Sequence, residues 1–122
     1  MSFDVLIIGA GAAGLSCALV LGSAKNKPFA KDKRIGIIAH QKSSHLQTAL
    51  FNNVLGLKPG TLGEDILNEG LQQLTDLYPH VTQIDSEKVT QIDKNSEDFK
   101  VTTNKGEYLS KIVVIAVGYT NL

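Results

Sequence analysis

Residues 4–24 read Asp-Val-Leu-Ile-Ile-Gly-Ala-Gly-Ala-Ala-Gly-Leu-Ser-Cys-Ala-Leu-Val-Leu-Gly-Ser-Ala, and they determine the fold class that we expect. An apolar run over residues 5–8 leads into the glycine-rich turn 9–14, and a helical pattern of small residues follows directly. This order of strand, glycine turn and helix is the context that the dinucleotide-binding fingerprint G-x-G-x-x-G requires. The stretch therefore predicts an α/β protein with a parallel sheet and flanking helices.

Each glycine of the turn has a separate physical role. Gly9 allows the tight turn out of the strand, Gly11 lets the backbone approach a pyrophosphate closely, and Gly14 lets the helix pack without an intervening Cβ. The free N–H groups of the first helical turn, where Ala12 and Ala13 stand, then face the ligand, and the helix dipole favours its negative charge. The alternative is a glycine-rich turn that only closes a strand–helix unit.

Length and composition set limits on the class of protein. The 122 residues suffice for one domain over 1–122, either a minimal module or an incomplete or N-terminal portion of a longer protein. The 12 basic and 12 acidic residues balance, so neither nucleic acid nor an anionic membrane is expected as a partner. The single cysteine, Cys17, fits a reduced, cytoplasmic setting, and we interpret it as a small buried hydrophobe.

Periodicity predicts the remaining elements. We expect a helix from Ala12 to about Leu21, a buried strand over residues 34–39, and a helix over 63–77 that Thr61 or Gly63 caps. Residues 46–57 are ambiguous. After Pro79 the period changes and predicts a small antiparallel meander, followed by an apolar strand over residues 111–118. The strands of the meander are expected at residues 81–84, 88–93, 98–103 and 107–109.

In this order of motifs the chain resembles the FAD-binding half of the thioredoxin reductase-like branch of the pyridine nucleotide-disulfide oxidoreductases. The resemblance implies a Rossmann-like FAD/NAD(P)-binding domain. Ala116-Val117-Gly118 resembles the Ala-Thr-Gly end of the family's second nucleotide motif, with Val117 in place of threonine. Residues 51–56 resemble the family's flavin-side loop, and this resemblance makes Asn53 the flavin-side residue. Ser44-His45-Leu46 stands where the family often has Gly-Gln-Leu, which implies that His45 faces the same region.

Three departures from the family pattern affect the expected chemistry. The acidic residue that normally ends the second strand and binds the adenosine ribose is replaced by Ala39, so recognition falls to His40, Gln41 or the backbone. His40 would also tolerate a phosphorylated ribose, which keeps an NADP-like cofactor open. No Cys-x-x-Cys is present, so disulfide reduction through a dithiol of this chain is excluded. The family's nicotinamide domain and its C-terminal Gly-Asp segment are not found in these residues.

We therefore expect an FAD-dependent oxidoreductase module whose electrons come from external NAD(P)H or a redox partner. Its catalytic residues are not identified. The alternatives are a non-catalytic dinucleotide-binding or assembly module, and direct NAD(P) binding, which the meander disfavours. A homodimer that covers the sheet edge is an option. No metal site is expected, because the histidines at 40, 45 and 80 lack acidic or cysteine partners at ligand spacing.

Overall fold

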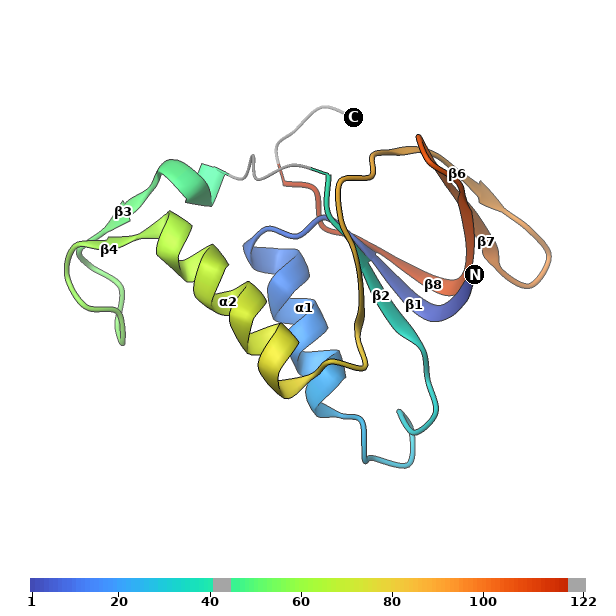
Figure 1. Ribbon diagram of the computed structural model, residues 1–122, viewed down its shortest axis with the longest axis horizontal. Coiled ribbons are helices and arrows are strands. Elements are labelled where there is room, and N and C mark those ends of the chain that lie inside the picture. Colours follow the sequence, from blue (N-terminus) through green and yellow to red (C-terminus); the bar gives the residue numbers. More distant parts are fainter. Residues whose placement is uncertain (41–44, 119–122) are drawn as a thin grey trace.

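The computed structural model describes residues 1–40 and 45–118. These described residues form one six-stranded sheet, a separate two-stranded sheet, and two helices with a short 3₁₀ turn (Figure 1). In chain order the elements are β1 (Ser2–Ile8), α1 (Ala12–Ser23), β2 (Ile35–Ile38), η1 (His45–Thr48), β3 (Leu50–Phe51), β4 (Thr61–Leu62), α2 (Gly63–Leu77), β5 (Thr82–Ile84), β6 (Val89–Lys94), β7 (Phe99–Thr103) and β8 (Glu107–Ile115).

The strand order of the main sheet is β5-β2-β1-β8-β7-β6. The first four of these strands run parallel to one another, whereas β8, β7 and β6 pair antiparallel. β1 and β2 form near-continuous apolar runs, because strands in the centre of a parallel sheet are buried on both faces. This arrangement confirms the expected Rossmann-like class.

Apolar side chains fill both faces of the sheet. On one face, Ile7 and Ile37 pack against Leu15 and Ala18 of α1 and Leu74 of α2. Figure 1 shows α1 and α2 side by side on that face. On the other face a second buried cluster joins the parallel strands to the meander: Phe3, Leu6, Ile8, Ile38, Ile84 and Val101.

The predicted helix over 63–77 is confirmed at both ends, but its predicted cap is wrong. Leu62 occupies the N-cap position, and no side chain caps the helix. A Cβ on Gly63 would collide with the backbone carbonyl of Leu46, so this glycine serves close packing against η1 rather than capping. Glu64 and Asp65 do lie in the first turn, where negative charge suits the helix dipole.

Two predictions for the region after Pro79 are also wrong. Residues 82–84 do not belong to the meander, because β5 pairs parallel with β2 at the edge of the sheet. The segments predicted as separate strands at 107–109 and 111–118 are joined in one nine-residue strand, β8, which ends at Ile115 and leaves residues 116–118 outside it. Its first residues pair with β7, and from Leu109 onward it pairs with β1. The meander is therefore continuous with the parallel sheet.

A buried carboxylate ties the meander to the parallel strands. Glu87 is 8% exposed and accepts hydrogen bonds from Thr103 Oγ1 at 2.7 Å and from Tyr108 Oη at 2.9 and 2.8 Å. Its backbone N–H donates to the carbonyl of Ala39, at the end of β2. The hydrogen bond from Thr103 is the main reason that the pKa of Glu87 lies below its ordinary value of 4.5, aided by Tyr108 and the charge of Lys105. Burial, followed by the carboxylate, raises the pKa of Tyr108 above 10.0.

We expect this cluster to make stability depend on pH. The lowered pKa of Glu87 contributes stability that is present above pH 4.5 and is lost as the pH falls through the folded-state value. Glu87→Gln should therefore cost about 1–2 kcal/mol at pH 7 and flatten the decline in melting temperature between about pH 5 and 3. The exposed Glu97→Gln is the matched control. An equally steep acid decline in both variants would contradict this account.

Candidate functional site

The carboxyl ends of β1, β2 and β8 meet at one edge of the sheet. Gly9 N–H donates to the carbonyl of Ile38 at 2.9 Å, and Ala116 N–H donates to the carbonyl of Ile8 at 2.8 Å. These bonds hold the glycine turn between the ends of the two neighbouring strands. In open parallel sheets, ligands bind at this carboxyl edge.

The backbones in this turn approach too closely for side chains at two positions. Gly9 has φ +109°, and a Cβ on it would lie 2.8 Å from the carbonyl carbon of Ala116. A Cβ on Gly14 would lie 2.8 Å from the carbonyl carbon of Gly9. The roles predicted for Gly9 in the turn and Gly14 in helix packing thus agree with the geometry.

The N-terminus of α1 is built to receive an anion. Gly11 is the N-cap residue with φ −83° and makes no side-chain cap, and the first turn contains no acidic residue. Ala12 and Ala13 are exposed and carry only methyl groups, so their own side chains leave the first N–H groups of the helix open. N–H donors at this position and the positive end of the helix dipole suit a diphosphate.

The end of β2 carries the residues that were predicted to bind the adenosine ribose. Ala39 is half-buried, and its N–H and carbonyl are engaged with Ile84 and Glu87. His40 follows and is exposed. Gln41, also predicted to bind the cofactor, lies outside the described residues. Within the described part, His40 is therefore the exposed polar side chain that directly follows this strand end.

The second predicted nucleotide motif lies beside the glycine turn. The carbonyl of Ala116 stands against Gly9, and Val117 packs with the second core cluster. Gly118 is exposed with φ +66°, a conformation that favours glycine. The structure thus brings together residues 9–14, Ala39 and residues 116–118.

The two predicted flavin-side residues lie elsewhere. Asn53 is exposed in the loop between β3 and β4, which projects beyond the N-terminus of α2, away from the sheet edge (Figure 1). His45 begins η1. The neighbouring Asn52 has a structural role that the sequence did not suggest, since its Oδ1 accepts a hydrogen bond from Gly60 N–H at 2.8 Å. The signal that could have predicted this role is the position of the asparagine at the start of a glycine-containing loop, where its side chain commonly bonds to the backbone.

Other chemistry is sparse in the described part of the chain. Cys17 is half-buried behind the turn, and burial raises the pKa of its thiol, which disfavours the reactive thiolate. Among residues 1–40 and 45–118, no three His, Cys, Asp or Glu side chains are grouped as metal ligands would be. Neither helix of that part has the length and apolarity needed to cross a bilayer.

Comparison with known proteins supports the predicted resemblance. The model of the family described as pyridine nucleotide-disulphide oxidoreductase matches residues 3–122. A ferredoxin–NADP reductase of Streptococcus pneumoniae is 32% identical over 123 residues, covering 95% of this chain and 35% of the relative. An uncharacterized CzcO-like oxidoreductase of Geobacillus kaustophilus is 31% identical over 126 residues, covering 94% and 36%. The chain thus spans about a third of the length of the curated relatives it matches.

Solved structures share the fold over nearly the whole chain. An oxidoreductase from Agrobacterium tumefaciens superposes with a TM-score of 0.79 at 28% identity, covering 98% of this chain and 38% of that one. A thioredoxin reductase from Streptococcus pyogenes gives 0.79 at 25% identity, covering 99% and 37%. A thioredoxin reductase from Gloeobacter violaceus gives 0.83 at 23% identity, covering 99% and 38%, and is similar in fold alone.

Proposed function

We propose that this chain, which belongs to the pyridine nucleotide-disulphide oxidoreductase family, binds FAD at the glycine turn and acts as the flavin-binding module of an oxidoreductase. The observation that carries the proposal is the cradle at residues 9–14. There, two glycines permit backbone contact that a Cβ would prevent, and the first turn of α1 has no side-chain cap. The oxygens of a diphosphate would accept hydrogen bonds from these N–H groups, and the helix dipole would stabilise its negative charge.

The residues around the cradle fit the rest of a dinucleotide. The N–H and carbonyl of Ala39 are already hydrogen-bonded within the protein, so the imidazole of His40 would hold the adenosine ribose. The backbone of residues 116–118 would flank the diphosphate. Since an alanine cannot accept a hydrogen bond from a hydroxyl through its side chain, we expect weaker ribose binding than an acidic residue at position 39 would give. Asn53 and His45 remain proposals for the flavin side.

Bound FAD supplies hydride and electron transfer, and this chain binds and orients it. Cys17 is the only cysteine, so no dithiol of these 122 residues relays electrons. We propose external NAD(P)H or a redox protein as the electron source. The relatives named ferredoxin–NADP reductase favour NADPH and a small electron-transfer partner. A cytoplasmic setting and a homodimer also remain proposals.

The test is reconstitution with FAD followed by visible spectroscopy. We expect flavin absorption to be retained after gel filtration and the melting temperature to rise with FAD concentration, because a ligand that binds only the folded state stabilises it. Bleaching by NADPH would support the oxidoreductase. Bleaching by dithionite alone would indicate a non-catalytic module or one that depends on a partner. A colourless protein whose melting temperature FAD leaves unchanged would refute FAD binding.

A further inference from the structure

The loop that follows β5 runs beside the end of β2, next to the residue proposed for the adenosine ribose. The N–H of Ala39 donates to the carbonyl of Ile84 at 2.8 Å, and the N–H of Glu87 donates to the carbonyl of Ala39 at 3.1 Å. These two bonds extend the pairing of β2 with β5 beyond Ile38. The backbone of residues 84–87 therefore fixes Ala39, the residue that directly precedes His40.

This loop has a backbone conformation that needs support from its surroundings. Ser86 has φ +59°, in the left-handed region that residues other than glycine, asparagine and aspartate occupy at a cost in free energy. A conformation of this kind persists where the neighbouring contacts determine it, and it is found most often at functional sites. For Ser86, the neighbouring contacts come from the turn that joins β7 to β8.

That turn holds the loop through both a side chain and the backbone. The carboxylate of Glu87, which is 8% exposed, accepts hydrogen bonds from the hydroxyls of Thr103 and Tyr108. Next to it, Lys88 N–H donates to Asn104 Oδ1 at 2.8 Å, and Asn104 N–H donates to the carbonyl of Lys88 at 3.0 Å. The position of residue 87 is thus set from the meander on one side, and residue 87 sets the end of β2 on the other.

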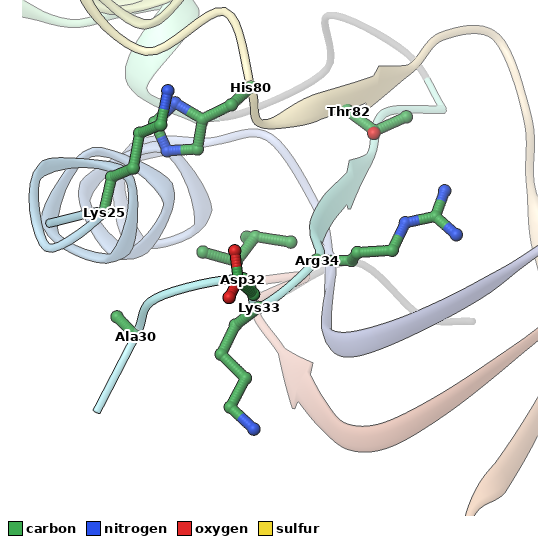
Figure 2. A pocket seen from close by; sticks show the side chains of 8 residues that line it. Lys25, Ala30, Asp32, Lys33, Arg34, His80 and Thr82 are labelled. Atoms are coloured by element: carbon green, nitrogen blue, oxygen red, sulfur yellow. The ribbon is translucent and has the colours of Figure 1, made fainter. Parts of the chain in front are cut away.

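The pocket at the amino edge of the sheet is less suited to a dinucleotide. It has a volume of about 280 Å³ and opens where β2 and β5 begin. Its cationic side chains diverge, since Figure 2 shows Lys25 beside His80 and Lys33 pointing away from both. The guanidinium of Arg34 lies over the ring of Phe3 at 5.7 Å. The described side chains of this pocket do not converge on one anion, so the carboxyl edge is the better match for the ligand.

We propose that Glu87 is a positioning residue for the adenosine half of the cofactor. Its carboxylate holds the loop, and the loop holds the end of β2 so that the imidazole of His40 meets the ribose. Residues that lock a binding side chain from behind contribute to affinity without touching the ligand. The inference rests on the proposed function, because it concerns the same site.

The test compares ADP, which is the adenosine diphosphate half of FAD, with pyrophosphate, which needs the glycine turn alone. Both are titrated calorimetrically into the full 122-residue chain at neutral pH, at a temperature where circular dichroism shows each variant folded. Glu87→Ala should raise the dissociation constant of ADP about tenfold and that of pyrophosphate by less than about twofold. Glu87→Gln keeps one oxygen for Thr103 and should recover most of the loss.

Tyr108→Phe tests the same contact with a smaller change to the buried cluster. It removes one hydroxyl and retains the ring, so we expect a folded protein with an ADP dissociation constant raised about threefold. A double-mutant cycle with His40→Ala then tests whether Glu87 acts through His40. In the His40→Ala background, Glu87→Ala should have little further effect on ADP binding.

Ser110→Ala separates positioning from a general loss of stability. Ser110 is 1% exposed, and its hydroxyl donates to the carbonyl of Ile112 at 2.6 Å. It pairs with Phe3, toward the amino edge of the sheet, and has no printed contact with the loop after β5. This variant should lose stability and bind ADP as wild type does.

The outcomes distinguish this inference from the proposed function. A wild-type chain that binds neither ADP nor pyrophosphate would refute the proposed function, and the role of Glu87 with it. If wild type binds ADP, then unchanged ADP affinity in Glu87→Ala and Tyr108→Phe would overturn the positioning role alone. Equal losses for ADP and pyrophosphate, an equal loss in Ser110→Ala, or a full effect of Glu87→Ala in the His40→Ala background would overturn it as well.

Discussion

Gly14→Ala is expected to lower the free energy of unfolding by about 3 kcal/mol or more, or to prevent folding altogether. The new Cβ would lie 2.8 Å from the carbonyl carbon of Gly9, closer than real Cβ contacts come. Backbone atoms cannot rotate aside as the end of a side chain can, so α1 would have to separate from the turn after β1. Helix propensity alone favours alanine by about 1 kcal/mol, and the collision outweighs it.

Gly70→Ala provides the control for this prediction. Gly70 also lies inside a helix, but a Cβ there would meet only Leu15 Cδ1 at 3.5 Å, an ordinary contact. We expect this variant to be more stable than wild type by about 0.5–1 kcal/mol. Urea denaturation followed by circular dichroism measures both changes. If the two variants lose stability equally, close backbone contact at Gly14 does not hold the helix against the strand.

Gly11→Val is expected to abolish FAD retention and leave the fold intact. Gly11 has φ −83°, which valine also adopts, so the substitution introduces little backbone strain. The isopropyl group would instead stand where the diphosphate must approach the first N–H groups of α1. We expect the dissociation constant for FAD to rise about 100-fold or more, with the far-ultraviolet circular dichroism unchanged.

Ser16→Val tests whether any added bulk on α1 has this effect. Ser16 is exposed one turn further along the same helix, outside the glycine turn. Flavin content after gel filtration should match wild type in this variant and fall to background in Gly11→Val. Retained flavin in Gly11→Val would place the diphosphate elsewhere in the molecule.

The parts of the fold with short-range signals could be predicted from the sequence. Residues 63–77 have apolar residues at helical spacing, residues 5–8 form an apolar run, and residues 12–21 are small and apolar after a glycine turn. The structure has α2, β1 and α1 there. The glycine cradle was predictable because each glycine answers a specific backbone requirement. Ala116, which lies beside Gly9, was assigned to the nucleotide site through the resemblance to the family and not through a local pattern.

The elements that depend on partners far along the chain were harder to predict. β5 is three residues long, and nothing in it tells a parallel partner such as β2 from a meander neighbour. β3 and β4 have two residues each, too few for any period. The buried Glu87 gave no signal, since glutamate is mostly exposed and its partners Thr103 and Tyr108 lie 16 and 21 residues away.

The position of β1 between β2 and β8 has a consequence for biosynthesis. Ser2 pairs with Leu109, so an early segment of the chain waits for one that is made 107 residues later. At a synthesis rate of about 5–20 residues per second, one side of β1 stays unpaired on the ribosome for several seconds. An apolar strand with an open side is a template for unwanted pairing between chains. Nascent chains of this protein should therefore need chaperone protection until β8 emerges.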